Sequence, residues 1–269
     1  MRILFVGDIL GKPGRRVLRA ILPSLVDRYS LDMVIGNVEN IFRGTGVSRE
    51  SINDVKKSGV HVMTSGNHIW KRSGAADLLK EETTLLRPSN YPPNVPGRGM
   101  MVWESNLGIR VGVMNLLGRV FMEPMECPFR TSEILLERLA ESGVRLCIVD
   151  FHAEATSEKS ALGWHLDGKV SAVVGTHTHV QTADERLLPK GTGFITDAGM
   201  TGAQDSVIGV KIEPSLKRFL TGVPQQLEPS GKNLMLNGVF MEICDDSGRC
   251  LEIRRVREYL DTKESKWNN

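Results

Sequence analysis

Short apolar runs alternate with helical patterns in the first part of the chain. Residues 2–7, 33–35 and 60–64 are compact apolar runs that predict strands buried on both faces. After Pro13, apolar residues recur at helical spacing, and Ser48 is a suitable N-cap for a second helix. Because crossovers between parallel strands are right-handed and usually helical, this alternation predicts a largely parallel sheet.

The rest of the chain continues this pattern with a more irregular middle. Residues 87–99, rich in Pro and Gly, predict an irregular surface loop, and residues 117–130 predict either an active-site lid or a loop anchored by its Met and Phe side chains. The other predicted elements are strands at 100–103, 109–114, 144–150, 170–175 and 192–196, helices at 131–141, 157–165 and from Pro214, a hairpin of 233–243 with 250–259, and a frayed polar tail at 263–269. No internal repeat or linker is found, so residues 1–269 are predicted to form one domain.

Composition and charge narrow the class of protein. Hydrophobic residues make up 41% and charged residues 25% of the 269 positions, as in ordinary globular proteins. The formal net charge of +2 argues against an extended nucleic-acid-coating surface, so stable nucleic-acid binding is not expected. The start of the chain does not resemble a secretory signal, and no stretch approaches the roughly 18 apolar residues of a membrane span. We therefore expect a cytoplasmic protein without a membrane segment.

The four cysteines show no metal-binding or disulfide pattern. Cys127, Cys147, Cys244 and Cys250 are scattered and lack C-x-x-C spacing. Cys244 and Cys250 could face each other across the predicted hairpin, but reduced cysteines are expected for a cytoplasmic protein.

Polar residues able to bind metal follow the predicted strands. Asp8 ends the first strand, Glu39 and Asn40 lie just beyond the second, and Asn67 and His68 follow the third. In open α/β sheets, ligands bind beyond the carboxyl ends of the strands. The positions of these residues therefore predict a shared site.

Two histidines follow a later apolar run at a spacing of two residues. The run from Val170 stops at Gly175, and His177 and His179 come directly after it. If residues 177–179 stay extended, both imidazoles point to the same side and can each hold a metal ion. His152 follows another buried run and is a further candidate.

These residues form five blocks in a fixed order. The blocks are G-D, N-V-E-N, G-N-H, F-H-A-E and G-T-H-T-H. Their order resembles the calcineurin-like metallophosphoesterase superfamily, and the strings H-A-E-A-T-S-E-K and T-D-A-G-M-T-G look most like its bacterial YmdB-like branch. The resemblance extends from Met1 to about Lys211.

Three departures from the wider superfamily are visible. Leu10 stands where a histidine usually completes the first block, and Glu39 replaces the usual bridging aspartate, both as in the YmdB-like branch. Ile69 stands where an acidic residue often follows G-N-H, so the sequence does not explain what orients His68.

The resemblance implies two metal ions and one proton donor. The first ion would be bound by Asp8, Glu39, Asn40 and His179. The second would be bound by Asn67, His152 and His177, with Glu39 bridging the two ions and His68 as the catalytic proton donor. A bridging carboxylate holds two ions about 3.5–4 Å apart, close enough to share one water and lower its pKa to about 7. Iron is expected, with manganese or zinc as alternatives, since oxygen and nitrogen ligands without thiolate suit all three.

The resemblance further implies an α/β fold with a four-layer α/β/β/α sandwich of two mixed, mostly parallel sheets. The implied activity is metal-dependent phosphodiester hydrolysis, with 2′,3′- or 3′,5′-cyclic nucleotides as the leading substrates. The alternatives are a phosphomonoesterase or ribonuclease on the same site, or a regulatory metal-binding protein acting through RNA or protein partners. A homo-oligomer is compatible with the resemblance. Further candidates for contacts to the ligands or the substrate are Glu154, Thr178, Asp197, Asp205 and Arg43.

Overall fold

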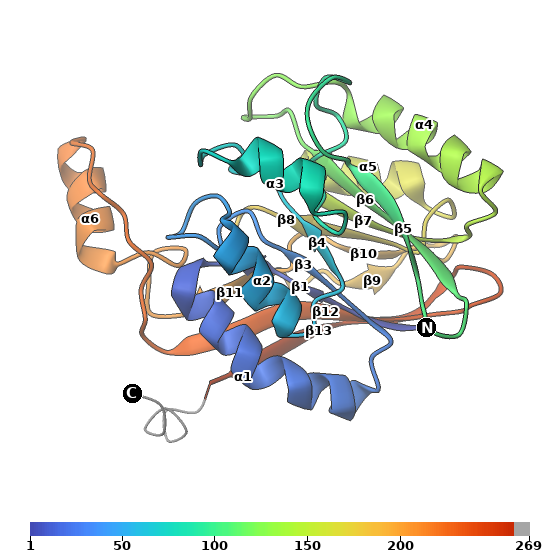
Figure 1. The fold of residues 1–269 in the computed structure, drawn as a ribbon, viewed down its shortest axis with the longest axis horizontal. Coiled ribbons are helices and arrows are strands. Elements are labelled where there is room, and N and C mark those ends of the chain that lie inside the picture. The colour runs from blue at the N-terminus through green and yellow to red at the C-terminus, as the bar shows by residue number, and fades with distance from the viewer. Residues whose placement is uncertain (261–269) are drawn as a thin grey trace.

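The computed structural model describes residues 1–260 of the chain. The predicted polar tail, residues 263–269, lies outside the described residues. Figure 1 shows two sheets packed against each other, with helices on their outer sides. The prediction of one domain across residues 1–269 stays a prediction.

The first sheet contains the N-terminal strands and the C-terminal hairpin. In it, β1 runs parallel to β3 and β3 parallel to β4, whereas β12 lies antiparallel to β1. β13 pairs with β12 and completes the predicted hairpin. In spatial order the strands are β2 (Asp8–Ile9), β11 (Met200–Ala203), β12 (Leu234–Ile243), β1 (Arg2–Val6), β3 (Met33–Asn37) and β4 (Val62–Thr64), with β13 (Cys250–Tyr259) on β12.

The second sheet is built from the middle of the chain. Its central strands β6, β7, β8 and β10 are parallel to one another, and an antiparallel strand flanks each side. In spatial order the strands are β5 (Met100–Glu104), β6 (Arg110–Leu117), β7 (Leu146–His152), β8 (Ala172–Thr176), β10 (Gly193–Ile195) and β9 (Arg186–Leu187). Both sheets are therefore mixed, as predicted.

Three apolar cores separate four layers. Phe5, Ile148 and Val174 belong to the core between the two sheets and are fully buried. Burying one such side chain contributes about 1.5–3 kcal/mol. Apolar residues of α1 (Gly11–Tyr29), α2 (Arg49–Lys57) and α3 (Ala75–Glu81) pack in a second core on the first sheet, and those of α4 (Pro128–Glu141) and α5 (Thr156–Leu166) pack in a third core on the second sheet. The predicted four-layer α/β/β/α sandwich is confirmed.

Local sequence signals explain where the early helices begin. Ser48 caps α2, because its hydroxyl accepts a hydrogen bond from the backbone N–H of Ser51, whose own hydroxyl bonds back to Ser48. Helix α1 begins at Gly11, two residues before Pro13. Pro13 therefore lies in the first helical turn, where proline is tolerated. Helix α4 likewise begins earlier than predicted, with Pro128 rather than Thr131 in its first turn.

Several short elements were not predicted. Strands β2, β9 and β11 have only two to four residues each, and α3 has seven. β11 exists because Met200 and Thr201 pair with Asp8 and Ile9, while Gly202 and Ala203 pair with β12. Such pairings join residues far apart in the sequence, so local periodicity does not reveal them.

Helix α6 (Ile212–Thr221) stands apart from the sandwich in Figure 1. Only Ser215 of this helix is buried, whereas Phe219 and Leu220 are 79% and 83% exposed. It begins two residues before the predicted start at Pro214, and its apolar side faces solvent. Across residues 1–260, no helix has the length and apolar character needed to cross a membrane.

Thiol reactivity should separate the cysteines into two pairs. All four are free, and Cys147 and Cys250 are buried while Cys127 and Cys244 are partly exposed. Burial raises the pKa of Cys147 and of Cys250 to about 12, and only the thiolate reacts. At neutral pH, iodoacetamide should label Cys127 and Cys244 in the folded protein and all four after denaturation, as read by mass spectrometry. Rapid labelling of Cys147 in folded protein would contradict the buried core.

Candidate metal centre

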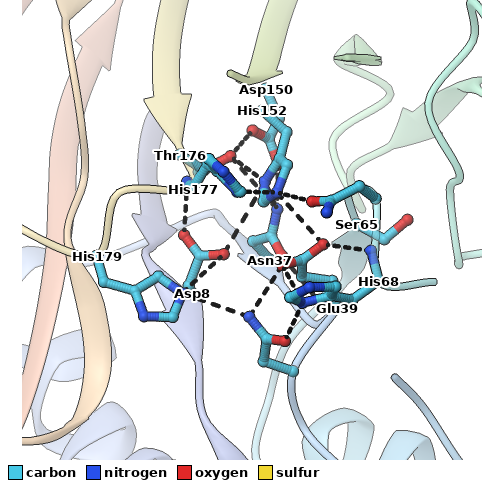
Figure 2. A network of polar contacts seen from close by, with 12 residues as sticks. Asp8, Asn37, Glu39, Ser65, His68, Asp150, His152, Thr176, His177 and His179 are labelled. Carbon is cyan, nitrogen blue, oxygen red and sulfur yellow. Dashed lines mark hydrogen bonds and ion pairs between the residues drawn. The ribbon is translucent and has the colours of Figure 1, made fainter. Parts of the chain in front are cut away.

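The predicted site residues converge at one edge of the sandwich. The carboxyl ends of β1, β3 and β4 in the first sheet and of β7 and β8 in the second meet there, and Figure 2 shows the side chains pointing toward one another. The residues brought together are Asp8, Glu39, Asn40, Asn67, His68, His152, His177 and His179. Parallel strands place their carboxyl ends at a common edge, which is why five separate segments meet.

Glu39 lies at the centre of this group and is only 1% exposed. One carboxylate oxygen accepts a hydrogen bond from the Asn40 amide at 2.9 Å, and the other accepts one from the backbone N–H of His68 at 3.0 Å. The His152 Nε2 atom lies 3.3 Å from the second oxygen. Glu39 therefore touches residues that the resemblance assigns to both ions.

A first set of electron-pair donors consists of the Nε2 atom of His152 and the atoms next to it. This nitrogen lies 3.0 Å from Nδ1 of His177 and 3.2 Å from Oδ1 of Asn67. Ligand atoms of Glu39, His152 and His177 all lie within 4.8 Å of one another. An arrangement of carboxylate, imidazole and amide oxygen donors is the kind that binds a divalent metal ion.

A second set forms around Asp8, which is fully buried at the start of β2. One of its oxygens accepts a hydrogen bond from the backbone N–H of His177, while Oδ1 has no hydrogen-bond partner. The His179 Nε2 atom lies 3.9 Å from that Oδ1 and 3.4 Å from the Asn40 amide nitrogen. Asn40 presents its N–H₂ group to this set, because its side-chain oxygen faces His68, so the oxygen would have to turn toward an ion to bind it. A buried carboxylate oxygen without a donor is costly, and a cation in this place would satisfy it.

The electrostatics also favour a positive charge between these residues. Burial acts to lower the pKa of His152, but the neighbouring carboxylates of Glu39 and Asp8 outweigh it and raise that pKa to about 9. Burial and the nearby His152 lower the pKa of His177 to about 3. The carboxylates of Glu39 and Asp8 thus favour positive charge where the donor atoms meet. Together with the unpaired Asp8 oxygen and the converging donors of Glu39, His152 and His177, this means that the residues present fit a divalent metal.

His177 and His179 lie on a turn and not on an extended strand. β8 ends at Thr176, and the two histidines have backbone φ angles of 101° and 66°. Such left-handed conformations are rare for residues with a side chain. Residues 177–179 are therefore not extended, and their imidazoles do not point to the same side. The turn directs His177 toward His152 and His179 toward Asp8.

A buried ion pair holds this turn. Asp197 accepts hydrogen bonds from both the backbone N–H and the hydroxyl of Thr178, at 3.1 and 2.7 Å. The same carboxylate oxygen contacts Nζ of Lys159 at 2.8 Å, and both charged groups are at most 1% exposed. Left-handed residues cost about 1–3 kcal/mol each, and charge-assisted hydrogen bonds of this kind offset that cost.

Comparisons with known proteins agree with the fold and the blocks. A family model described as "YmdB-like protein" matches residues 4–256. The chain belongs to the YmdB-like family. A Bacillus subtilis (strain 168) protein named "2′,3′-cyclic-nucleotide 2′-phosphodiesterase" is 42% identical over 256 residues, covering 95% of this chain and 96% of that protein. The predicted membership of the YmdB-like branch is thereby confirmed.

Solved structures extend the comparison. A Thermus thermophilus structure titled as a hypothetical protein is similar, with a TM-score of 0.90, 42% identity and coverage of 96% of this chain and 99% of that one. A 5′-nucleotidase precursor from the same organism is 12% identical with a TM-score of 0.58, covering 97% of this chain and 54% of that one, and it shares the fold alone. The predicted enzyme class, a phosphoric ester hydrolase, is confirmed by the name of the Bacillus subtilis relative and not by this fold likeness.

His68 of this YmdB-like chain is oriented by residues other than its sequence neighbour. Its Nδ1 atom lies 2.9 Å from the Asn40 side-chain oxygen and 3.2 Å from a Glu39 oxygen. Ile69 is fully buried in the core of the first sheet. Asn40 and Glu39 therefore take the orienting part that an acidic residue after G-N-H would have.

A cavity of about 250 Å³ opens onto the site. It is lined by Glu39, His68, Glu154, His177, Thr178, His179 and Ile208. Residues 117–130 do not line it, and two of their side chains, Met122 and Phe129, pack on the outer core of the second sheet. Met122 and Phe129 therefore anchor this segment, whereas Phe121 is 90% exposed.

The further candidates differ in how they relate to this YmdB-like site. A Glu154 carboxylate oxygen lies 3.2 Å from Nε2 of His177, and Asp197 with Thr178 holds the histidine turn. Asp205 instead accepts a hydrogen bond from Asn233, and the Arg43 guanidinium lies over the ring of Phe42.

Four buried polar residues near the site were missed by sequence reasoning: Asn37, Asp150, Lys159 and Thr176. Three of them lie at strand ends next to predicted ligands, where a polar residue within an apolar run was the available signal. Lys159 ends the string H-A-E-A-T-S-E-K on α5, and only the folded structure shows that it pairs with Asp197 behind the histidine turn.

Gly66 is required where the chain passes the site. A Cβ atom built on Gly66 would overlap the His152 ring and a Glu39 carboxylate oxygen. We expect Gly66→Ala to cost about 1–3 kcal/mol and to lower metal content, because the donor atoms would be pushed apart. Gly231→Ala is the matched control, since a Cβ there meets nothing within 4 Å. Thermal unfolding and elemental analysis measure both effects, and equal behaviour of the two variants would contradict the argument.

Proposed function

We propose that this YmdB-like chain is a dinuclear-metal phosphodiesterase that hydrolyses cyclic nucleotides, with 2′,3′-cyclic nucleotides as the leading substrates. The observation that carries the proposal is the convergence of buried donor atoms around Glu39, which borders both the His152 set and the Asp8 set. The printed name of the Bacillus subtilis relative supports the choice of substrate.

Each ion would be held by one of the two donor sets, with Glu39 shared. Asp8, Asn40 and His179 would bind the first ion, and Asn67, His152 and His177 the second. Iron is the proposed metal, with manganese or zinc as alternatives, because the donors are oxygen and nitrogen without thiolate. When bound, the ions would supply the positive charge that activates a water and neutralises the phosphoryl oxygens.

The charge of the site suits a phosphodiester. Asp8 and Glu39 are the two anions among the proposed ligands, and the other ligands are neutral amides and imidazoles, so two divalent ions would leave a modest positive charge. A diester carries one negative charge and has an alkoxide leaving group that needs a proton. Both needs can be met at this site.

His68 would be the catalytic proton donor. Its side chain is 32% exposed and lines the cavity, and Asn40 and Glu39 fix its ring. A donor must reach the departing oxygen while the rest of the site holds the phosphoryl group. A regulatory metal-binding protein acting through RNA or protein partners would not need this histidine at the cavity.

Removing His68 should slow catalysis without emptying the metal site. We expect His68→Ala to lower the rate of hydrolysis by about 10²-fold or more, since general acid catalysis contributes about 10²–10⁴-fold. Metal content should not change. His165→Ala is the matched control, because His165 lies outside the site beside Glu133.

The substrate class is decided by a panel of phosphoesters. Wild-type enzyme loaded with iron, manganese or zinc is compared on cyclic nucleotides, linear RNA and phosphomonoesters. Preference for 2′,3′-cyclic nucleotides supports the proposal, and preference for monoesters or linear RNA supports the alternative on the same site. Inactivity on every substrate with all three metals would sink the enzyme proposal and leave the regulatory one.

Metal stoichiometry tests the bridging part of Glu39. Elemental analysis of the loaded wild type should give two ions per chain, because Glu39 can contribute to both donor sets. His179→Ala should retain one ion, since the His152 set does not include this residue. One ion per chain in the wild type would contradict the dinuclear centre.

A further inference from the structure

A chain of buried polar side chains lies behind His152. Asn37, Asp150 and Thr176 are each 0% exposed and lie at the ends of β3, β7 and β8. Thr176 contacts Nδ1 of His152 whereas Glu39 lies by Nε2, so Thr176 and Asp150 lie on the side of the imidazole away from Glu39 (Figure 2). Asn37 joins Asp150 to the backbone of Glu39. Burying the Asp150 carboxylate costs free energy of desolvation, so its presence here calls for a structural role.

The direction of each hydrogen bond in this chain is fixed. Asn37 Oδ1 accepts from the backbone N–H of Glu39 at 3.1 Å, so its Nδ2 must be the atom that donates to Asp150 Oδ2 at 2.9 Å. Because a carboxylate can only accept, the Thr176 hydroxyl donates to Asp150 Oδ1 at 2.7 Å. A hydroxyl has one hydrogen, and this contact uses it.

The consequence for His152 is a defined tautomer. The Thr176 oxygen has no hydrogen left for Nδ1 of His152, 2.9 Å away, so this contact is a hydrogen bond only when Nδ1 carries a hydrogen and donates it. The other polar neighbour of Nδ1, the Asn37 amide nitrogen, is farther away at 3.4 Å and makes its shorter hydrogen bond to Asp150, so the Thr176 contact favours the Nδ1–H form. In the neutral ring the other nitrogen, Nε2, then has a free electron pair. That electron pair faces Glu39, Asn67 and His177, where the donor atoms converge.

The other two histidines are oriented differently. Nδ1 of His179 donates to the backbone carbonyl of Ile208 at 2.8 Å, and Nε2 of His177 lies 3.2 Å from the carboxylate of Glu154, which is about half exposed. Among these three rings, only that of His152 is held by a side-chain hydroxyl linked to a fully buried carboxylate. Its metal-facing nitrogen is therefore the one set most firmly by the interior of the protein.

We propose that Asp150 and Thr176 are positioning residues that hold His152 as the Nδ1–H tautomer, so that its Nε2 is available to the metal. Asn37 orients the Asp150 carboxylate and also fixes the backbone of Glu39. The inference rests on the metal centre of the proposed function, because the tautomer matters only if Nε2 binds an ion. Partners of this kind, lying behind a metal-binding histidine, change metal affinity by about 10–100-fold when removed.

Thr176 offers a matched pair of variants. Thr176→Val keeps the shape of the side chain and removes the hydroxyl, whereas Thr176→Ser keeps the hydroxyl and removes a methyl group. With zinc alone as the probe, we expect the valine variant to bind one of its two ions, the one held by the His152 set, about 10–100-fold less tightly. The serine variant should bind zinc as the wild type does. Competition with a chromophoric chelator gives the affinities, and thermal unfolding without metal shows whether each variant folds.

A direct measurement on the wild type needs no variant. In zinc-loaded protein, ¹⁵N nuclear magnetic resonance of His152 should show a hydrogen on Nδ1 and metal on Nε2. Metal on Nδ1 would overturn the proposal, as would zinc affinity in Thr176→Val equal to that of the wild type. Equal loss of affinity in the valine and serine variants would also overturn it, because the hydroxyl would then not be the cause.

These outcomes separate the inference from the proposed function. Wild-type protein that binds two zinc ions with the expected tautomer, yet hydrolyses no phosphoester, would retain the positioning role and refute the phosphodiesterase. Protein that hydrolyses cyclic nucleotides normally, with no difference between Thr176→Val and wild type in zinc affinity, would refute the positioning role alone.

Discussion

The buried carboxylate of Glu39 is the constraint on which the rest of the site depends. Burial opposes its charge, yet the rings of His152 and His68 hold the pKa of Glu39 well below its usual range. An anion in the interior needs compensating charge or hydrogen-bond donors from every side. The strand ends of both sheets supply them, and the two-sheet sandwich is the arrangement that lets segments of both sheets reach one carboxylate.

Two buried acids support the histidines from behind, by different means. Asp197, paired with Lys159, fixes the backbone of the turn that carries His177 and His179. Asp150, through Thr176, fixes the ring of His152. Neither acid touches the cavity, so their cost in desolvation is explained by the shape that they impose on residues that do. The site is thus a polar network inside an apolar sandwich.

Much of this organisation could be predicted from the sequence. Apolar runs that lead to Asp8, Glu39 and His152 predict strands whose ends carry polar groups. The helical spacing of apolar residues and the capping residue Ser48 located α1 and α2 to within a few residues. The short strand β11 could not be predicted in this way, because it depends on pairing with β2 and β12. The partner of His68 was also hidden, since Asn40 precedes it by 28 positions and approaches only in the fold.

The sequence alone determined which residues could bind metal and at which strand ends they lie, because residue type and hydrophobic period are local properties. The tertiary structure decided how those residues face one another. It placed His177 and His179 on a left-handed turn that sends their rings to different donor sets. It also placed Asp150, Thr176 and Lys159 behind them, since a side chain's partners across two sheets depend on strand order and register, which no local pattern encodes.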